Sequence, residues 1–187
     1  MELMNAIYGR RAIRHFTNRD VPREVIAALA EAAAQAPSAM NSQSWAFAVF
    51  KGRERLQDFS ERAKLYFQES FSPGSADPDV RMREILTKPG YNIFHDATTL
   101  VVVYAKPNHD RFAVGACYLA AQNLMLSAFD MGLGTCPIGF AQPWLDLDEI
   151  KAELGIPVQY TAVFPLVVGY PEGPAEDPHR HRPEFLN

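Results

Sequence analysis

The spacing of apolar and polar residues divides the chain into helical and extended segments. Apolar positions at helical spacing predict helices over residues 2–9, 21–36, 53–70, 110–131 and 146–154. Mostly apolar runs, the strongest rich in β-branched residues, predict strands over residues 45–50, 98–105 and 161–170. Residues 72–79, SPGSADPD, are rich in turn formers and predict a loop. Because strands and helices do not alternate regularly, the order favours an α+β fold over a doubly wound parallel sheet.

Three segments carry more specific expectations. Residues 110–131 are apolar on most faces, which predicts a central, buried helix that Gly132 ends. Pro165 interrupts the strand at 161–170, and proline cannot donate to a strand ladder, so this strand is expected at a sheet edge or with a bulge. Four prolines after Tyr170 predict an extended C-terminal segment.

Length and composition bound the class of protein. The 187 residues, 48% hydrophobic and 21% charged, suit one globular domain over residues 1–187. The net charge of −4 argues against a nucleic-acid binder. Two cysteines without a CxxC argue against zinc and structural disulfides and favour a reducing compartment. The chain lacks a signal-peptide apolar core and a membrane-length apolar run, so we expect a cytoplasmic protein with no membrane partner.

The segment GRRAIRHF, residues 9–16, concentrates positive charge in an acidic chain. Arg10, Arg11 and Arg14 fall within eight positions. Arginine binds phosphate through a planar, bidentate fork and stays charged, so the cluster could hold a phosphate monoester. Alternatively, Arg10 and Arg11 lie at a helix C-terminus, where cations are mildly stabilising.

Two loops could face a flat ligand. APSAMNSQSW, residues 36–45, crowds small polar groups into a connection, although taken alone it favours ordinary turn hydrogen bonds. GLGTCPIGF, residues 132–140, is not a dinucleotide fingerprint, because Pro137 replaces the third glycine and the segment follows a helix. Its glycines would still allow backbone to approach a planar ring. A helix cap explains Gly132 but leaves Gly139 unexplained.

The C-terminal HRHR, residues 179–182, has three interpretations. Alternate residues of an extended segment point the same way, so Arg180 and Arg182 could share a target. His179 and His181 without an acidic or cysteine partner nearby are a weak metal signal. The segment could also be a charged tail without a fixed conformation.

The sequence offers no acid–base or nucleophile constellation. There is no GxSxG, Cys136 has no adjacent basic residue, and Cys117 falls inside the apolar helix, so both thiols are expected to be buried and unreactive. His95 and Asp96, adjacent in an extended segment, would point to opposite faces. If the chain is an enzyme, a cofactor is expected to carry the chemistry.

Taken in order, RRAIRHF, APSAMNSQSW, GLGTCPIGF after a long helix, VVGYP and a basic tail resemble the FMN-dependent nitroreductase family over nearly the whole chain. The resemblance implies that Arg10, Arg11 and Arg14 hold the FMN phosphate and ribityl side, with Ala12 contributing backbone where members often have serine. It implies that Arg180 and Arg182 close over the phosphate. Two further groups are implied: a loop reaching FMN from the partner subunit (Pro37, Ser38, Ala39, Asn41) and a stretch along the isoalloxazine ring (Pro137, Ile138, Gly139). Some relatives have glutamate at the position of Ile138, so contact there would fall to backbone groups.

The resemblance also implies an architecture and an activity. Members are α/β/α sandwiches with a mostly antiparallel sheet, and they form homodimers with FMN at the interface. The implied reaction is ping-pong transfer of electrons from NADH or NADPH, through FMN, to nitroaromatic or quinone acceptors, with no catalytic side chain and no metal. The alternatives are another reaction on the same fold (dehalogenation or a specialised oxidation), a non-catalytic flavin-binding protein, or a module for a different phosphate ligand.

Overall fold

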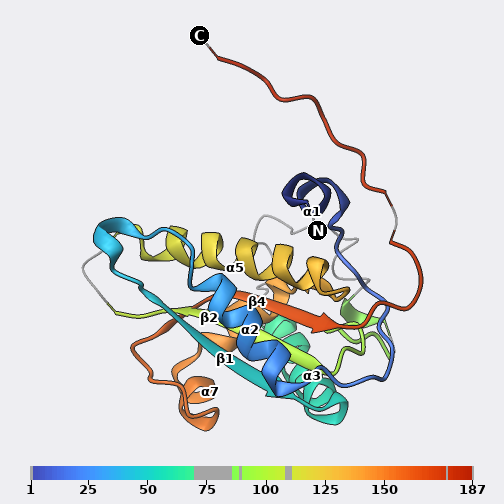
Figure 1. Cartoon of the computed structure of the whole chain (residues 1–187). Coiled ribbons are helices and arrows are strands. Elements are labelled where there is room, and N and C mark those ends of the chain that lie inside the picture. Colours follow the sequence, from blue (N-terminus) through green and yellow to red (C-terminus); the bar gives the residue numbers. More distant parts are fainter. Residues whose placement is uncertain (1, 70–85, 89, 108–110, 176, 187) are drawn as a thin grey trace.

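An antiparallel sheet runs through the middle of the molecule (Figure 1). The computed structural model describes residues 2–69, 86–88, 90–107, 111–175 and 177–186. Within these ranges the strand order is β1 (Trp45–Lys51), β2 (Thr99–Ala105), β4 (Thr161–Gly169) and β3 (Gly134–Pro137). Each neighbouring pair is antiparallel, so the prediction of a mostly antiparallel α+β sheet is confirmed.

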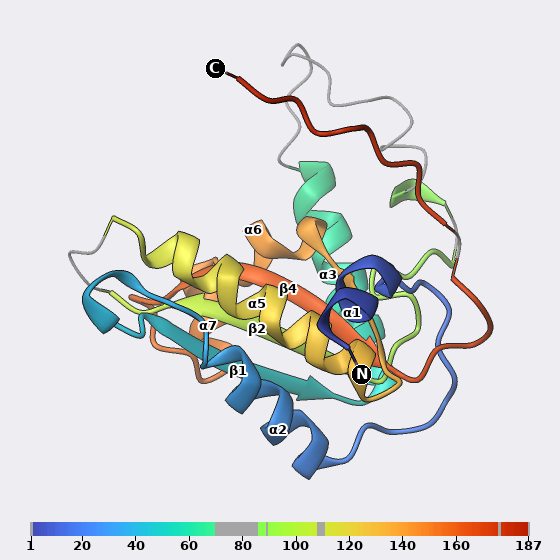
Figure 2. The same ribbon diagram turned by 45° about the horizontal axis from the view of Figure 1, so that its top comes forward.

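Helices cover both faces of this sheet (Figure 2). The α-helices are α1 (Leu3–Gly9), α2 (Arg23–Ala33), α3 (Arg53–Glu69), α5 (Ala113–Asp130), α6 (Gln142–Leu145) and α7 (Asp148–Glu153). Two 3₁₀ turns, η1 (Ala39–Asn41) and η2 (Gly139–Ala141), join them. One hydrophobic core packs α2 and α5 against the sheet, and a second packs α3, α6 and α7 against the opposite face. Among the described residues, no helix combines the length and apolarity needed to cross a membrane.

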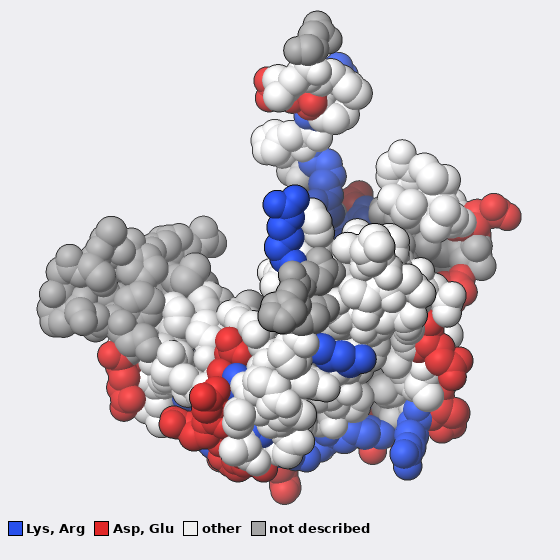
Figure 3. Space-filling model, turned by 90° about the vertical axis from the view of Figure 1, so that its left-hand side faces the viewer, with Lys and Arg blue, Asp and Glu red and all other residues white. Residues whose placement is uncertain are grey.

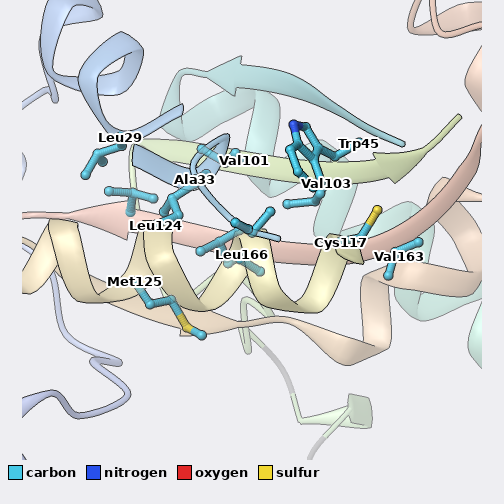
Figure 4. Close-up of a cluster of buried hydrophobic side chains, with 14 of the residues drawn as sticks. Leu29, Ala33, Trp45, Val101, Val103, Cys117, Leu124, Met125, Val163 and Leu166 are labelled. Carbon is cyan, nitrogen blue, oxygen red and sulfur yellow. The ribbon is translucent and has the colours of Figure 1, made fainter. Parts of the chain in front are cut away.

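The apolar run of β2 is explained by burial on both faces. Val101 and Val103 point into the core under α5, while Leu100 and Val102 point into the core under α3. Figure 4 shows Leu124 and Cys117 of α5 facing the strands with Leu29 and Ala33 of α2. A strand buried on both sides reads as continuously hydrophobic rather than alternating.

The predicted helices and long strands are present, within a few residues of their expected bounds. The loop expected at residues 72–79 lies outside the described residues. Strand β3, within GLGTCPIGF, was not expected as a strand.

Of the two expectations for the strand containing Pro165, the bulge is correct and the sheet edge is wrong. β4 lies between β2 and β3. Its register against β2 shifts between Val103 and Tyr104, which leaves Val163 as the extra residue. Pro165 is tolerated because it lies just beyond the last β3 pair, Pro137 with Leu166. Its carbonyl still accepts from the Ile138 N–H there, but no strand pairing on that side requires an N–H from residue 165.

The segment after α1 extends the sheet at the free edge of β3. Ala12 forms a parallel bridge with Thr135, and the Ile13 N–H donates to the Thr135 carbonyl at 2.9 Å. This approach requires a glycine at position 134, because an added Cβ would lie 2.5 Å from Ile13 Cγ1. Phe16 forms an antiparallel bridge with Pro171, and its side chain lies against Gly169. The arginine segment is thereby held beside the start of the C-terminal segment.

Candidate anion and cofactor site

A cleft of about 530 Å³ opens between the N-terminal arginine segment and the C-terminal segment. Its lining comprises residues 10–15, Met125, Pro137, residues 172–175, Asp177, Pro178 and Arg180. The volume falls within the range of small-molecule and cofactor sites, about 300–1,000 Å³. The structure therefore brings together the arginine motif, the tail and part of GLGTCPIGF.

Three guanidinium groups line this cleft without an anion from the described chain. The side chains of Arg10, Arg14 and Arg180 make no hydrogen bond or ion pair with another described residue. Burial, together with the charges of Arg180 and Arg11, lowers the pKa of Arg10. Converging, mutually repelling cations fit a ligand that carries several negative charges.

Arg11 differs from its neighbours because its guanidinium is bonded within the chain. Nε donates to Asp177 Oδ1 at 3.0 Å, and Nη2 donates to the same oxygen. Nη1 donates to the carbonyls of Tyr8 and Arg10, at the C-terminus of α1. Of the two interpretations of these arginines, the interaction with a helix C-terminus applies to Arg11. The phosphate-binding interpretation remains open for Arg10, which lines the cleft without a bonded partner among the described residues.

The stretch of Pro137, Ile138 and Gly139, which the family resemblance places along the isoalloxazine ring, is only partly open to solvent. Pro137 lines the main cleft and also a second one of about 380 Å³, which includes Gly139 and Tyr118. Ile138 is 3% exposed, and its N–H donates to Pro165 O at 2.9 Å while its carbonyl accepts from the Ala141 N–H. Both backbone groups of Ile138 are therefore already bonded, and Pro137 and Gly139 are the members of this stretch that face open space.

The loop containing Pro37, Ser38, Ala39 and Asn41 does not reach the cleft of its own chain. It lies at the opposite end of α5 (Figure 1). Its turn chemistry is confirmed: Ser38 Oγ accepts from the Gln43 N–H at 3.0 Å, and Met40, Asn41 and Gln43 adopt positive φ. The Met40 side chain is 99% exposed. A contribution from this loop to a partner's site stays a prediction.

The tail is extended, as expected, and stands away from the body (Figure 3). Arg180 lines the cleft, whereas Arg182 lies beyond its described lining. The His179 and His181 rings contact each other edge to face, with centroids 5.0 Å apart. Nowhere in the described ranges do three or more His, Cys, Asp or Glu residues cluster as metal ligands do.

A histidine beside the cleft is held uncharged at neutral pH. His95 and Asp96 both adopt positive φ, in a turn rather than in the extended segment expected from sequence. Burial, with the charges of Arg14 and His15, lowers the pKa of His95 to about 4. Asp96 accepts a hydrogen bond from Asn92 at 3.1 Å, and the His95 ring contacts Tyr91.

Both cysteines are buried, as expected. Burial raises the pKa of Cys117 to about 11, and it also raises the pKa of Cys136. Since the thiolate is the reactive form, neither side chain is prepared for nucleophilic attack.

Sequence reasoning missed Asp177, Met125 and residues 172–175 as parts of the cleft. Asp177 had a usable signal, because it is an acid three positions before Arg180 in a basic segment. Met125 had none, because its position at the cleft depends on how α5 packs.

Comparisons with known proteins identify the family of the chain. The sequence model of the nitroreductase family matches residues 7–170. The chain belongs to the nitroreductase family. The nitroreductase NfnB of Mycolicibacterium smegmatis is 31% identical over 178 residues, covering 80% of this chain and 75% of that protein.

Two further relatives, one compared by structure and one by sequence, carry different names. A nitroreductase with bound FMN from Desulfitobacterium hafniense superposes with a TM-score of 0.80 at 25% identity, covering 100% of this chain and 99% of that one. The iodotyrosine deiodinase of Thermotoga neapolitana is 25% identical over 168 residues, covering 88% of this chain and 86% of that protein. Relatives of this nitroreductase-family chain therefore carry names for more than one reaction.

Proposed function

We propose that this nitroreductase-family protein binds FMN in the arginine cleft and acts as an NAD(P)H-dependent oxidoreductase. The observation that carries the proposal is the convergence of Arg10, Arg14 and Arg180, without anionic partners among the described residues, in a cofactor-sized cleft. The FMN-bound relative of the same fold supports the choice of ligand.

The residues present fit FMN. Arg10, Arg14 and Arg180 would hold its phosphate, because guanidinium groups form charge-assisted, bidentate contacts with phosphate oxygens. Ala12 lines the same cleft, and Pro137 and Gly139 would offer a small, open surface to the ring. When bound, FMN supplies hydride-accepting and electron-donating chemistry.

The two thiols and His95 lie outside the cleft lining and would not compete with the cofactor chemically. The thiols of Cys117 and Cys136 stay protonated, and His95 stays neutral at neutral pH. The chain's part is therefore binding and electrostatic tuning of the cofactor, and the proposed acceptors are nitroaromatic compounds and quinones.

The proposed active form is a homodimer with the cofactor at the interface. The exposed faces of two helices carry apolar side chains: Leu3, Met4, Ile7 and Tyr8 of α1, and Val114, Tyr118 and Leu119 of α5. A second copy would bury these side chains. It would also bring the loop of Pro37, Ser38, Ala39 and Asn41 to a cleft, which one chain alone does not do.

Anaerobic spectroscopy tests the activity. The protein, reconstituted with FMN and separated from free cofactor, is titrated with NADPH or NADH, and then a nitroaromatic compound, a quinone or 3-iodo-L-tyrosine is added. We expect the flavin absorption to bleach with a nucleotide and to return with the nitroaromatic compound or the quinone. Return with 3-iodo-L-tyrosine alone would favour deiodination, and absorption that neither nucleotide bleaches would contradict the proposal.

A further inference from the structure

We infer that Arg11 and Asp177 form a clasp that holds the C-terminal segment across the cleft, so that Arg11 is a positioning residue and not a ligand of the phosphate. The inference rests on the proposed function, because it assigns roles within the cleft that would bind FMN. It separates two adjacent arginines that the sequence motif treats alike.

The hydrogen bonds of Arg11 leave little capacity for a ligand. A guanidinium group has five N–H donors. Arg11 uses four of them, two toward Asp177 and one each toward the carbonyls of Tyr8 and Arg10. The remaining donor cannot form the two parallel bonds that make arginine a specific phosphate ligand.

Backbone geometry explains why the neighbours diverge. Arg10 ends α1 with extended backbone, at φ −61° and ψ 134°. Consecutive side chains of extended backbone point in opposite directions. Both side chains line the cleft, but only the Arg11 guanidinium is bonded to the helix end and to Asp177 of the tail.

The clasp fixes the segment that carries Arg180. Asp177 lies three residues before Arg180, and both residues line the cleft. Figures 1 and 2 show the chain after α1 running beside the chain after β4, which is where the clasp joins them. Arg11 and Asp177 also line a neighbouring cleft of about 350 Å³, so the pair stands between the two spaces. The Arg11 side chain is 22% exposed and that of Asp177 is 86% exposed, so the acid is the accessible half.

The two possible roles of Arg11 predict opposite effects on FMN affinity when the carboxylate of Asp177 is removed. If Arg11 bound the phosphate, Asp177 would compete for its guanidinium, and removing the acid would strengthen FMN binding. If the pair is a clasp, removing the acid releases Arg180 and weakens FMN binding.

The test is FMN titration of the apoprotein, followed by flavin fluorescence, for the unaltered chain and four variants. Asp177→Asn is expected to weaken FMN binding about two- to fivefold, the range of a partly exposed ion pair. Asp177→Glu is expected to restore most of the affinity, and Arg11→Lys to match Asp177→Asn because lysine lacks the fork. The double variant Arg11→Lys with Asp177→Asn is expected to be no weaker than either single variant, since the two residues act as a pair. Tighter binding by Asp177→Asn, or additive losses in the double variant, would overturn the clasp.

Tryptic cleavage after Arg180 tests the clasp without FMN. Asp177 and Glu184 each lie four positions from the Arg180–His181 bond, one on either side, so Glu184→Gln is a matched control. In the apoprotein, Asp177→Asn is expected to be cut at least about threefold faster than Glu184→Gln, because cleavage follows the opening of the segment. Equal rates would overturn the clasp. If the proposed function itself is wrong, the unaltered protein will bind no FMN, and this result is distinct from either outcome of the cleavage test.

Discussion

At the scale of single residues, the site depends on which way each arginine side chain points. Arg10 and Arg11 are adjacent and chemically identical, yet one lines the cleft unpaired and the other is tied to Tyr8, Arg10 and Asp177. Arg14 faces the cleft and lies close enough to His95 to lower the pKa of that imidazole. Arg10, Arg14 and Arg180 therefore line the cleft without an ion pair to a described residue, although the acids Glu172 and Asp177 also line it and Asp177 pairs with Arg11.

Removing Arg10 is expected to weaken FMN binding more than removing any cation outside the cleft. A charge-assisted hydrogen bond contributes about 1.5–3 kcal/mol, so Arg10→Ala should raise the FMN dissociation constant about 10- to 150-fold. Arg23→Ala, at an exposed position at the start of α2, is the matched control and should leave it unchanged. Equal effects of the two substitutions in the same titration would show that Arg10 acts only through the net charge.

His95 makes stability depend on pH. Its folded pKa is about 4, below the ordinary value of about 6.5, so the unfolded chain binds more protons between these values. The contribution of neutral His95, about 1–3 kcal/mol, is full above pH 6.5 and is lost as the pH falls toward 4. His95→Asn keeps a residue that tolerates positive φ, and urea unfolding at several pH values should show a shallower loss for this variant. An unchanged slope would assign the acid sensitivity to other groups.

At the scale of elements, the site is built by an edge of the sheet. β3 is only four residues long, but it pairs with β4 on one side and receives Ala12 and Ile13 on the other. This arrangement fixes the arginine segment next to residues 171–175 and Asp177. The glycine at position 134 makes the approach possible.

Substituting this glycine is expected to push the arginine segment off the sheet. In Gly134→Ala, the new Cβ would meet Ile13 Cβ at 2.8 Å, so the free energy of unfolding should fall by about 1–3 kcal/mol. FMN affinity should fall with it. Adding Ile13→Ala removes Cγ1 and Cγ2, two of the three atoms that the new Cβ would meet, although the Cβ of residue 13 remains. The double variant should therefore be less destabilised than the sum of the single variants. Additive losses in urea unfolding would place the strain elsewhere.

The elements that could be read from the sequence are those whose pattern is local. β2 and α5 could be read from the sequence because each is a continuous apolar segment. β2 is buried along its whole length, whereas the expectation that α5 is fully buried is wrong for this chain, because Val114, Tyr118 and Leu119 are exposed on its outer face. β3 carries no such pattern, since GTCP is a strand only because β4 and Ala12 lie beside it. The same limit applies to Pro165, where the sequence predicts a disturbance but the neighbouring strands decide that it is a bulge. His95 and Asp96 were misplaced because their turn is fixed by contacts with Asn92 and the core.

For the candidate site, sequence motifs predicted some of the residues, and only the folded structure revealed the roles of the others. The arginine motif, Pro137 and Arg180 were expected and meet in one cleft. The separate role of Arg11 could not be expected, because it depends on Asp177 arriving from 166 positions along the chain. The polar loop of Pro37 and Ser38 lies at the far end of α5, so its expected role requires a second chain.

At the scale of the whole molecule, the distribution of exposed apolar side chains points to assembly. Leu119 of α5 is 48% exposed and lies with other apolar residues on the outer face of that helix. Near the end of the C-terminal segment, beyond the residues that line the cleft, Phe185 and Leu186 are 86% and 87% exposed. An isolated chain would leave these surfaces in water, which soluble monomers rarely do over large patches.

A charge on the outer face of α5 is therefore expected to break the proposed dimer. Leu119→Asp should shift the sedimentation coefficient from dimer to monomer, because burying an unpaired carboxylate is costly. Val158→Asp is a matched control at 47% exposure away from α5, and it should remain dimeric. FMN binding should weaken in Leu119→Asp alone, since the shared site would be lost. A monomeric unaltered protein would contradict the proposed assembly.

The most direct measurement of the central claim compares FMN with riboflavin, which has the same ring and ribityl chain but no phosphate. If Arg10, Arg14 and Arg180 hold the phosphate, the apoprotein should bind FMN at least about 100-fold more tightly than riboflavin. This preference should shrink as salt is added, because the contacts are ionic. Equal affinities for the two flavins would contradict the assignment of the cleft as a phosphate site.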